Sequence, residues 1–124
     1  MRTLVLMMLR QPVAQCLTKK LSGASGVRVL HYSDYSNAAG AVHTDGADTV
    51  LVEIAESGEY DASYCLALCS RLRGAAPGCR LLALCPEHDG AGVLAMVEAK
   101  QEGLIEDFIF YDASIDYMAS KLLA

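Results

Sequence analysis

The stretch DTVLVEIAESGEYD, residues 48–61, joins a buried strand to an exposed turn. Residues 50–52 and 54 are Val, Leu, Val and Ile, a continuous apolar run that predicts a strand covered on both faces, as in a parallel sheet. Glu53 places a carboxylate inside that run. Because burying an unpaired charge is unfavourable, the reason for this acid must lie in what the neighbouring strand ends carry.

On both sides of this strand, apolar runs alternate with apolar residues at helical spacing, and the pair repeats five times along the chain. Pro, Ser and Asp residues mark helix starts, and Gly residues mark helix ends. The predicted strands are Thr3–Met8, Val27–His31, Thr49–Ile54, Arg80–Cys85 and Asp107–Tyr111. The predicted helices run from Pro12 to Ser22-Gly23, over Asn37–Thr44, from Asp61 or Ser63 to Gly74, and over Ala113–Leu123. A fourth helix in chain order follows Pro86, which ends the preceding strand, and continues through Val93, Leu94, Met96 and Val97 until Gly103.

Five strand-then-helix units with short connections predict right-handed crossovers and a parallel sheet between two helical layers. We therefore expect an α/β protein, a (βα)5 three-layer α/β/α sandwich with strand order 2-1-3-4-5. This order places a functional crevice at the carboxyl ends of strands one and three, where Glu53 lies. No repeat or linker divides residues 1–124, so we expect one domain.

Composition excludes several classes of protein. The 124 residues are 53% hydrophobic and carry a net charge of −5 without a basic cluster, which argues against direct nucleic-acid binding through this domain. No apolar stretch approaches the ~20 residues that span a bilayer, and no signal peptide is evident, so we expect a cytoplasmic protein with no membrane contact. Five cysteines without paired spacing fit reduced, mostly packed thiols better than disulfides or a zinc site.

Three motifs together resemble response-regulator receiver domains of two-component phosphorelay signal transduction, over essentially the whole chain. ADTVLVE, residues 47–53, resembles the third strand that leads to the phosphorylatable Asp of that family. SRLRGAAPGCRLLALC, residues 70–85, is similar to the passage from helix three to strand four, and EGLIEDFIFYD, residues 102–112, resembles the run into strand five. The match rests on their order and spacing, and it implies a flavodoxin-like fold.

The resemblance also implies a phosphorylation site that this chain does not reproduce. The family uses an acidic pair for Mg²⁺, an Asp, a Thr or Ser, and a Lys. The corresponding residues here are Met7-Met8 (or Met8-Leu9), Glu53, Cys85 and Tyr111. We therefore expect a degenerate, atypical site that is poor in cations, binds no magnesium or other cofactor, and does not accept a phosphoryl group.

Two interpretations of Glu53 stay open. Glu is longer than Asp by one methylene, about 1.5 Å, so Glu53 can imitate the reach of a phosphorylated Asp and hold the domain in one state. Alternatively, Glu53 is a hydrated carboxylate at a strand end, left in a decayed site.

The leading functional hypothesis is a non-catalytic receiver-like module that acts by protein contact. Its partners would be a sensor kinase or an output domain, which we expect beyond residue 124 and which would suit transcription regulation. The family dimerises through helix four, strand five and helix five, so we expect a homodimer, with an ordinary solvated surface as the alternative. The candidate dimer face is Met96, Lys100, Asp107, Asp116, Tyr117 and Lys121, together with Glu102.

Two other hypotheses use the same crevice. One is a small flavodoxin-like enzyme or redox protein in which Glu87 and His88 activate Cys85. The other is a conventional phospho-acceptor that is modified on Glu53 itself. A nucleotide site has no support, because the sequence contains no glycine-rich phosphate loop.

Overall fold

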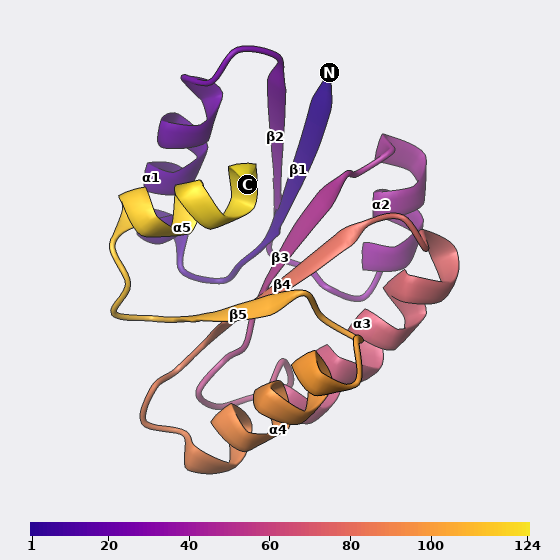
Figure 1. The fold of residues 1–124 in the computed structure, drawn as a ribbon, viewed down its shortest axis with the longest axis vertical. Coiled ribbons are helices and arrows are strands. Elements are labelled where there is room, and N and C mark those ends of the chain that lie inside the picture. The colour runs from indigo at the N-terminus through magenta and orange to yellow at the C-terminus, as the bar shows by residue number, and fades with distance from the viewer.

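A computed structural model describes all residues, 1–124, as a single sheet between two layers of helices (Figure 1). Strands and helices alternate strictly along the chain. The strands are β1 (Arg2–Met7), β2 (Val27–Tyr32), β3 (Thr49–Glu53), β4 (Arg80–Cys85) and β5 (Asp107–Phe110). The helices are α1 (Gln11–Ser22), α2 (Ala38–Asp45), α3 (Ala62–Ala75), α4 (Gly90–Gln101) and α5 (Ile115–Leu123).

All five strands are parallel and follow the order β2-β1-β3-β4-β5, which confirms the predicted fold class. In the register, Met7 lies opposite Val52, and Glu53 lies opposite Leu84. The carboxyl ends of β1 and β3 therefore meet at one edge of the sheet, as the crevice prediction requires.

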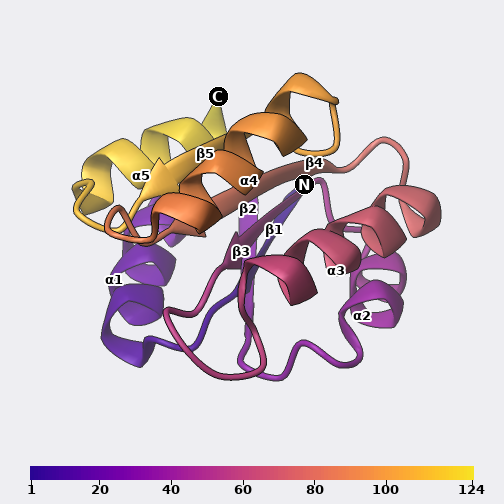
Figure 2. The ribbon, with the colours of Figure 1, turned by 90° about the horizontal axis from the view of Figure 1, so that it is seen from below.

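Two apolar cores lie on the two faces of the sheet. One core packs α2, α3 and α4 against the sheet, and the other packs α1 and α5 against the opposite face (Figure 2). Every residue of β3 is buried, because helices cover both of its faces. The same arrangement buries the thiols of Cys65 and Cys69, as predicted for small packing residues.

Side chains cap the starts of α3 and α5 by hydrogen bonds to backbone amides. The Asp61 carboxylate accepts a hydrogen bond from the Tyr64 amide at the start of α3, and the Ser114 hydroxyl accepts one from Tyr117 at the start of α5. At the start of α2, Asn37 occupies the N-cap position, but its side chain makes no capping bond. The nearby Asp34 carboxylate instead binds Ser36 within the loop.

Two arginines from the beginnings of strands hold the end of α5. Arg2 donates to the Leu123 carbonyl at 2.7 Å, and Arg80 donates to the Leu122 and Ala124 carbonyls at 3.1 and 3.0 Å. The last carbonyls of a helix have no partner within the helix, so these bonds satisfy groups that would otherwise need water. None of the helices has the length and apolarity needed to cross a bilayer.

Candidate functional site

Glu53 ends β3 and is almost completely enclosed, with 1% of its surface exposed. One carboxylate oxygen accepts hydrogen bonds from the backbone amides of Leu9 and Arg10, at 2.8 and 3.1 Å. The other accepts one from the Arg10 Nε at 2.5 Å. The interpretation of Glu53 as a hydrated carboxylate is therefore wrong, because the loop between β1 and α1 replaces water around it.

Arg10 supplies the positive charge that the sequence analysis did not find. Its guanidinium carbon lies 3.7 Å from the centre of the Tyr111 ring, a cation–π contact, while its Nε binds Glu53. The expectation of a cation-poor pocket is wrong, because the cation comes from the loop after β1 and not from the end of β5. The only available signal was position, since Arg10 precedes Pro12 in a loop at the same edge of the sheet.

Tyr111 directly follows β5 and connects this end of the sheet to the residue after β3. Its hydroxyl donates a hydrogen bond to the Ile54 carbonyl. Burial raises the pKa of Tyr111, and the charge of Glu53 raises it further, so the phenol stays protonated near neutral pH. Tyr111 therefore acts as a neutral wall of the site and as the face on which Arg10 rests.

Met7 and Met8 occupy the predicted positions, but their side chains belong to the two cores. Both residues are fully buried, Met7 with α2, α3 and α4, and Met8 with α1 and α5. Consecutive residues of an extended chain point to opposite faces of a sheet, which explains the separation. Neither side chain lines the cavity beside Glu53.

Tyr35 is a buried residue of this region that sequence reasoning missed. Its hydroxyl lies 2.8 Å from both the Met7 and the Glu53 carbonyl oxygens, so its proton can bond to either. Its ring stacks on Tyr60, with ring centres 4.0 Å apart. Burial raises the pKa of Tyr35, which keeps this donor protonated and ties the ends of β1 and β3 together.

The cavity at this edge has a volume of about 320 Å³. It is lined by Leu9, Arg10, Glu53, Ala55, Glu56, Ser57 and Tyr111. The magnesium ion that the fold family implies does not fit these residues, because the positions of its acidic pair carry buried methionines and the oxygens of Glu53 already bind Arg10 and two amides. In addition, no three His, Cys, Asp or Glu side chains are grouped to hold a metal ion.

Cys85 is fully buried at the end of β4, and its thiol contacts the Pro86 carbonyl at 3.6 Å. Burial, with smaller contributions from Asp89 and Glu87, raises the pKa of Cys85 to about 11. The reactive thiolate is therefore scarce near neutral pH. His88 is 90% exposed and contacts Glu87 at 3.6 Å, so the arrangement lacks a base bonded to the thiol.

The structure places the residues predicted for the dimer face in different environments. Met96 is fully buried in the core, so its assignment to that face is wrong. Lys100 and Lys121 both bind the Asp107 carboxylate, at 3.1 and 2.5 Å. Although burial raises the pKa of Asp107, the hydrogen bonds from the two lysines outweigh it and bring that pKa to about 2. These charges are therefore paired within one chain.

Three apolar or aromatic side chains are exposed on α4, β5 and α5, and two of them, Leu94 and Phe110, were not predicted for the dimer face. Leu94 of α4 is 59% exposed, Phe110 of β5 37%, and Tyr117 of α5, which was predicted, 50%. Asp116 lies beside Tyr117 in the sequence and pairs with Lys20 at 3.0 Å. Because α4, β5 and α5 lie on one side of the molecule (Figure 2), that side carries a mixed apolar and charged surface.

Comparisons with known proteins give a match at the level of structure only. No family model matches the sequence, and no curated protein matches it. The structure is similar to a CheY-like protein, TadZ, from Pseudomonas aeruginosa, with a TM-score of 0.74, 18% identity, and coverage of 99% of this chain and 98% of that one. It is also similar to the isolated REC domain of RcsB from Salmonella enterica, with a TM-score of 0.77, 12% identity, and coverage of 99% and 86%.

A third similar structure is an adenylate cyclase from Rhodopirellula baltica, with a TM-score of 0.78, 16% identity, and coverage of 98% of this chain and 84% of that one. Identities this low establish the fold alone. The chain therefore has the fold of response-regulator receiver domains over its whole length, which confirms the resemblance drawn from the three sequence motifs.

Proposed function

We propose that this chain is a receiver-like signalling module that acts by protein contact and needs no phosphorylation. The observation that carries the proposal is the buried ion pair between Glu53 and Arg10. In phosphoryl transfer, a metal ion and a lysine neutralise the incoming group. Here a guanidinium from the same chain already neutralises the carboxylate at that position.

The hydrogen bonds of Glu53 support this proposal further. A carboxylate has about four lone-pair sites, and three of those of Glu53 already accept hydrogen bonds. Attack on a phosphodonor would require Glu53 to break its bond to Arg10 and to leave a closed environment. The ion pair holds the β1–α1 loop against the end of β3, which supports the hypothesis of a receiver-like domain held in one state.

Exposed side chains on α4, β5 and α5 are the surface proposed for protein contact. Leu94, Phe110 and Tyr117 supply apolar area, and Asp116 supplies charge. We propose that this surface binds a second copy of the chain or an output domain. Binding of such a protein partner requires no catalytic residue. The alternative of a thiol enzyme is disfavoured, because Cys85 is buried and its pKa is raised.

Incubation with Mg²⁺ and acetyl phosphate tests the proposal directly. Intact-mass analysis should show no added phosphate on this protein, while a receiver domain with the full aspartate site, treated in parallel, gains one. A phosphate adduct that is lost in Glu53→Gln would overturn the proposal and establish the conventional phospho-acceptor. An adduct that persists in Glu53→Gln would place the modification elsewhere and would also contradict a phosphorylation-independent module.

A further inference from the structure

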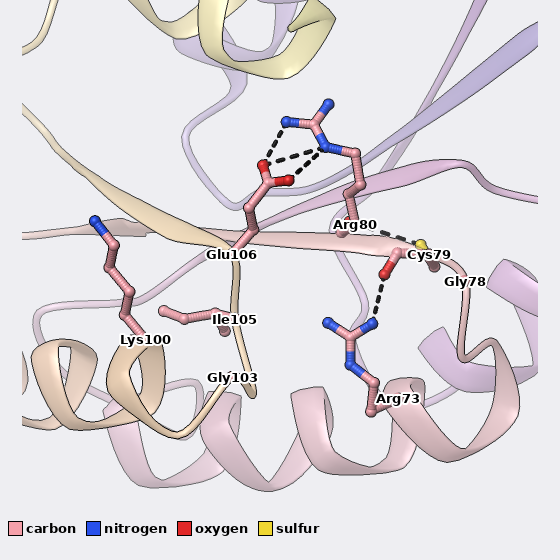
Figure 3. A pocket seen from close by; sticks show the side chains of 8 residues that line it. All are labelled: Arg73, Gly78, Cys79, Arg80, Lys100, Gly103, Ile105 and Glu106. Carbon is pink, nitrogen blue, oxygen red and sulfur yellow. Dashed lines mark hydrogen bonds and ion pairs between the residues drawn. The ribbon is translucent and has the colours of Figure 1, made fainter.

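A second pocket lies at the opposite end of the sheet from Glu53, where β4 and β5 begin (Figure 3). It has a volume of about 540 Å³, within the range of roughly 300–1,000 Å³ found for small-molecule sites. The last turns of α3 and α4 form two of its sides. Its lining residues are Arg73, Gly78, Cys79, Arg80, Lys100, Gly103, Ile105 and Glu106.

The charge around this pocket is opposite to that of the whole chain. Arg73, Arg80 and Lys100 line it, and Glu106 is its only carboxylate. The ion pairs next to the pocket add Asp107 and Lys121, and Asp48 lies near Cys79, so four bases stand against three acids and one positive charge is in excess. In a protein with a net charge of −5, such a local excess of positive charge makes the pocket a place where an anion can bind.

Arg73 is a partly buried cation with no carboxylate partner. Its guanidinium donates hydrogen bonds to the carbonyls of Pro77, Cys79 and Leu104, at 3.1, 2.7 and 3.1 Å. Its Nε is buried and has no partner at all. Neutral carbonyls orient the guanidinium toward the pocket without cancelling its charge, so an anion in the pocket would supply the missing counter-ion (Figure 3).

Lys100 is a second cation that can turn to an anion at little cost. Its side chain is 50% exposed, and it shares the Asp107 carboxylate with Lys121, which binds at 2.5 Å. If Lys100 left Asp107, that carboxylate would still be paired. The rim is open at Gly78 and Gly103, since a Cβ built at either position would meet no atom within 4 Å.

We propose that this pocket binds the phosphate group of a small phosphorylated molecule, with Arg73 and Lys100 as its cationic ligands. Arg80 forms a fixed wall, since it is already held by Glu106 and by the end of α5. A phosphate ion would fill only part of the volume, which leaves room for the remainder of an organic ligand. The site is independent of the Glu53 region and of any phosphoryl transfer.

NMR titration at constant ionic strength tests this site. Inorganic phosphate and ribose 5-phosphate are each added to ¹⁵N-labelled protein in exchange for chloride, and the Nε–Hε signal of Arg73 is followed. We expect a saturable shift of that signal, with the sugar phosphate binding more tightly if the remaining volume is used. Equal affinity for both would contradict an organic ligand and would identify free phosphate as the molecule bound.

Lys100→Gln removes one proposed ligand while leaving Asp107 paired with Lys121. We expect it to weaken binding about fivefold or more, the scale of a charge-assisted hydrogen bond. Lys19→Gln makes the same change at an exposed position of α1, away from the pocket, and should leave the affinity unchanged.

Three results would overturn the proposal. The first is the absence of a saturable shift at Arg73 with either probe. The second is binding that Lys100→Gln leaves unchanged. The third is a response confined to the Lys19 and Lys20 surface, which would show general attraction of anions to exposed lysines.

Discussion

A single buried carboxylate, Glu53, makes the β1–α1 loop part of the core of the site. Its bonds to Arg10 and to two amides connect that loop to the end of β3. A buried ion pair contributes little relative to apolar residues of the same size, but loss of one partner leaves the other charge without compensation. The pair therefore determines conformation more strongly than it determines total stability.

Arg10→Met should lower the free energy of unfolding by about 2–4 kcal/mol, because Glu53 then remains buried without its counter-ion. The expected loss is below that of a fully enclosed pair because the Arg10 side chain is 36% exposed. Urea unfolding measures it. Arg10→Met combined with Glu53→Leu should be more stable than Arg10→Met alone. Arg28→Met removes an exposed arginine and is the control; an equal loss there would contradict the role of the pair.

The five thiols should differ sharply in reactivity. Cys16 is exposed and the other four cysteines are buried. Burial raises the pKa of Cys85 to about 11, so its thiolate is rare at pH 7.5 to 8. Thiol labelling should therefore modify Cys16 rapidly, and Cys85 only after unfolding. Rapid labelling of Cys85 in the Cys16→Ser variant would instead support the thiol-enzyme hypothesis.

Single elements show which features a sequence can predict. The bounds of β4 were predicted correctly, because its apolar run lies between Arg80 and Pro86. The start of α2 was predicted to within one residue, but its capping bond was not, because several polar residues precede the helix and tertiary contacts decide their partners. In the site, strand position placed Glu53 and Tyr111 correctly. Arg10 was missed because the path of a loop side chain depends on packing that hydrophobic periodicity does not describe.

Asp107 should make the packing of α4, β5 and α5 sensitive to acid. Its pKa in the folded protein is about 2, against an ordinary value of 3.8, so the unfolded chain takes up a proton first as the pH falls. The stabilisation present above about pH 4 is lost toward pH 2. Because the group is near the surface, we expect a loss of about 1–2 kcal/mol.

Unfolding by urea between pH 5 and pH 2 measures this loss. The Asp107→Asn variant should show a shallower decline in stability than the unaltered protein. Asp116→Asn, an exposed neighbour on α5, should follow the unaltered protein. Some decline will remain in both, since Arg80 also lowers the pKa of Glu106. Identical curves for Asp107→Asn and the unaltered protein would contradict the assignment.

At the scale of the whole molecule, the two ends of the parallel sheet carry different chemistry. The carboxyl end holds a neutralised acid, and the amino end holds an excess of positive charge. The surface of α4, β5 and α5 runs along one side between them and exposes Leu94, Phe110 and Tyr117. The proposed anion pocket borders the proposed contact surface at Lys100 of α4, while Leu94, Phe110 and Tyr117 lie outside the pocket lining.

Leu94→Glu should weaken self-association if the proposed surface joins two copies. A charge placed at the centre of an apolar contact has to be desolvated in the dimer, which favours the monomer. Sedimentation velocity over a range of concentrations measures the shift. Thr44→Glu places the same charge at an exposed position of α2 and should leave the association unchanged. A dimer that persists in Leu94→Glu would show that another surface is used.

The arginine contacts at the end of α5 bring the first and last segments of the chain within reach of one side chain. Arg2 of β1 binds the Leu123 carbonyl at 2.7 Å. This bond ties the first strand to the last helix although the two segments are far apart in the sequence. Fraying of the last turn of α5 would therefore also release Arg2 at the edge of the sheet, so the two extremities of the chain come loose as a unit.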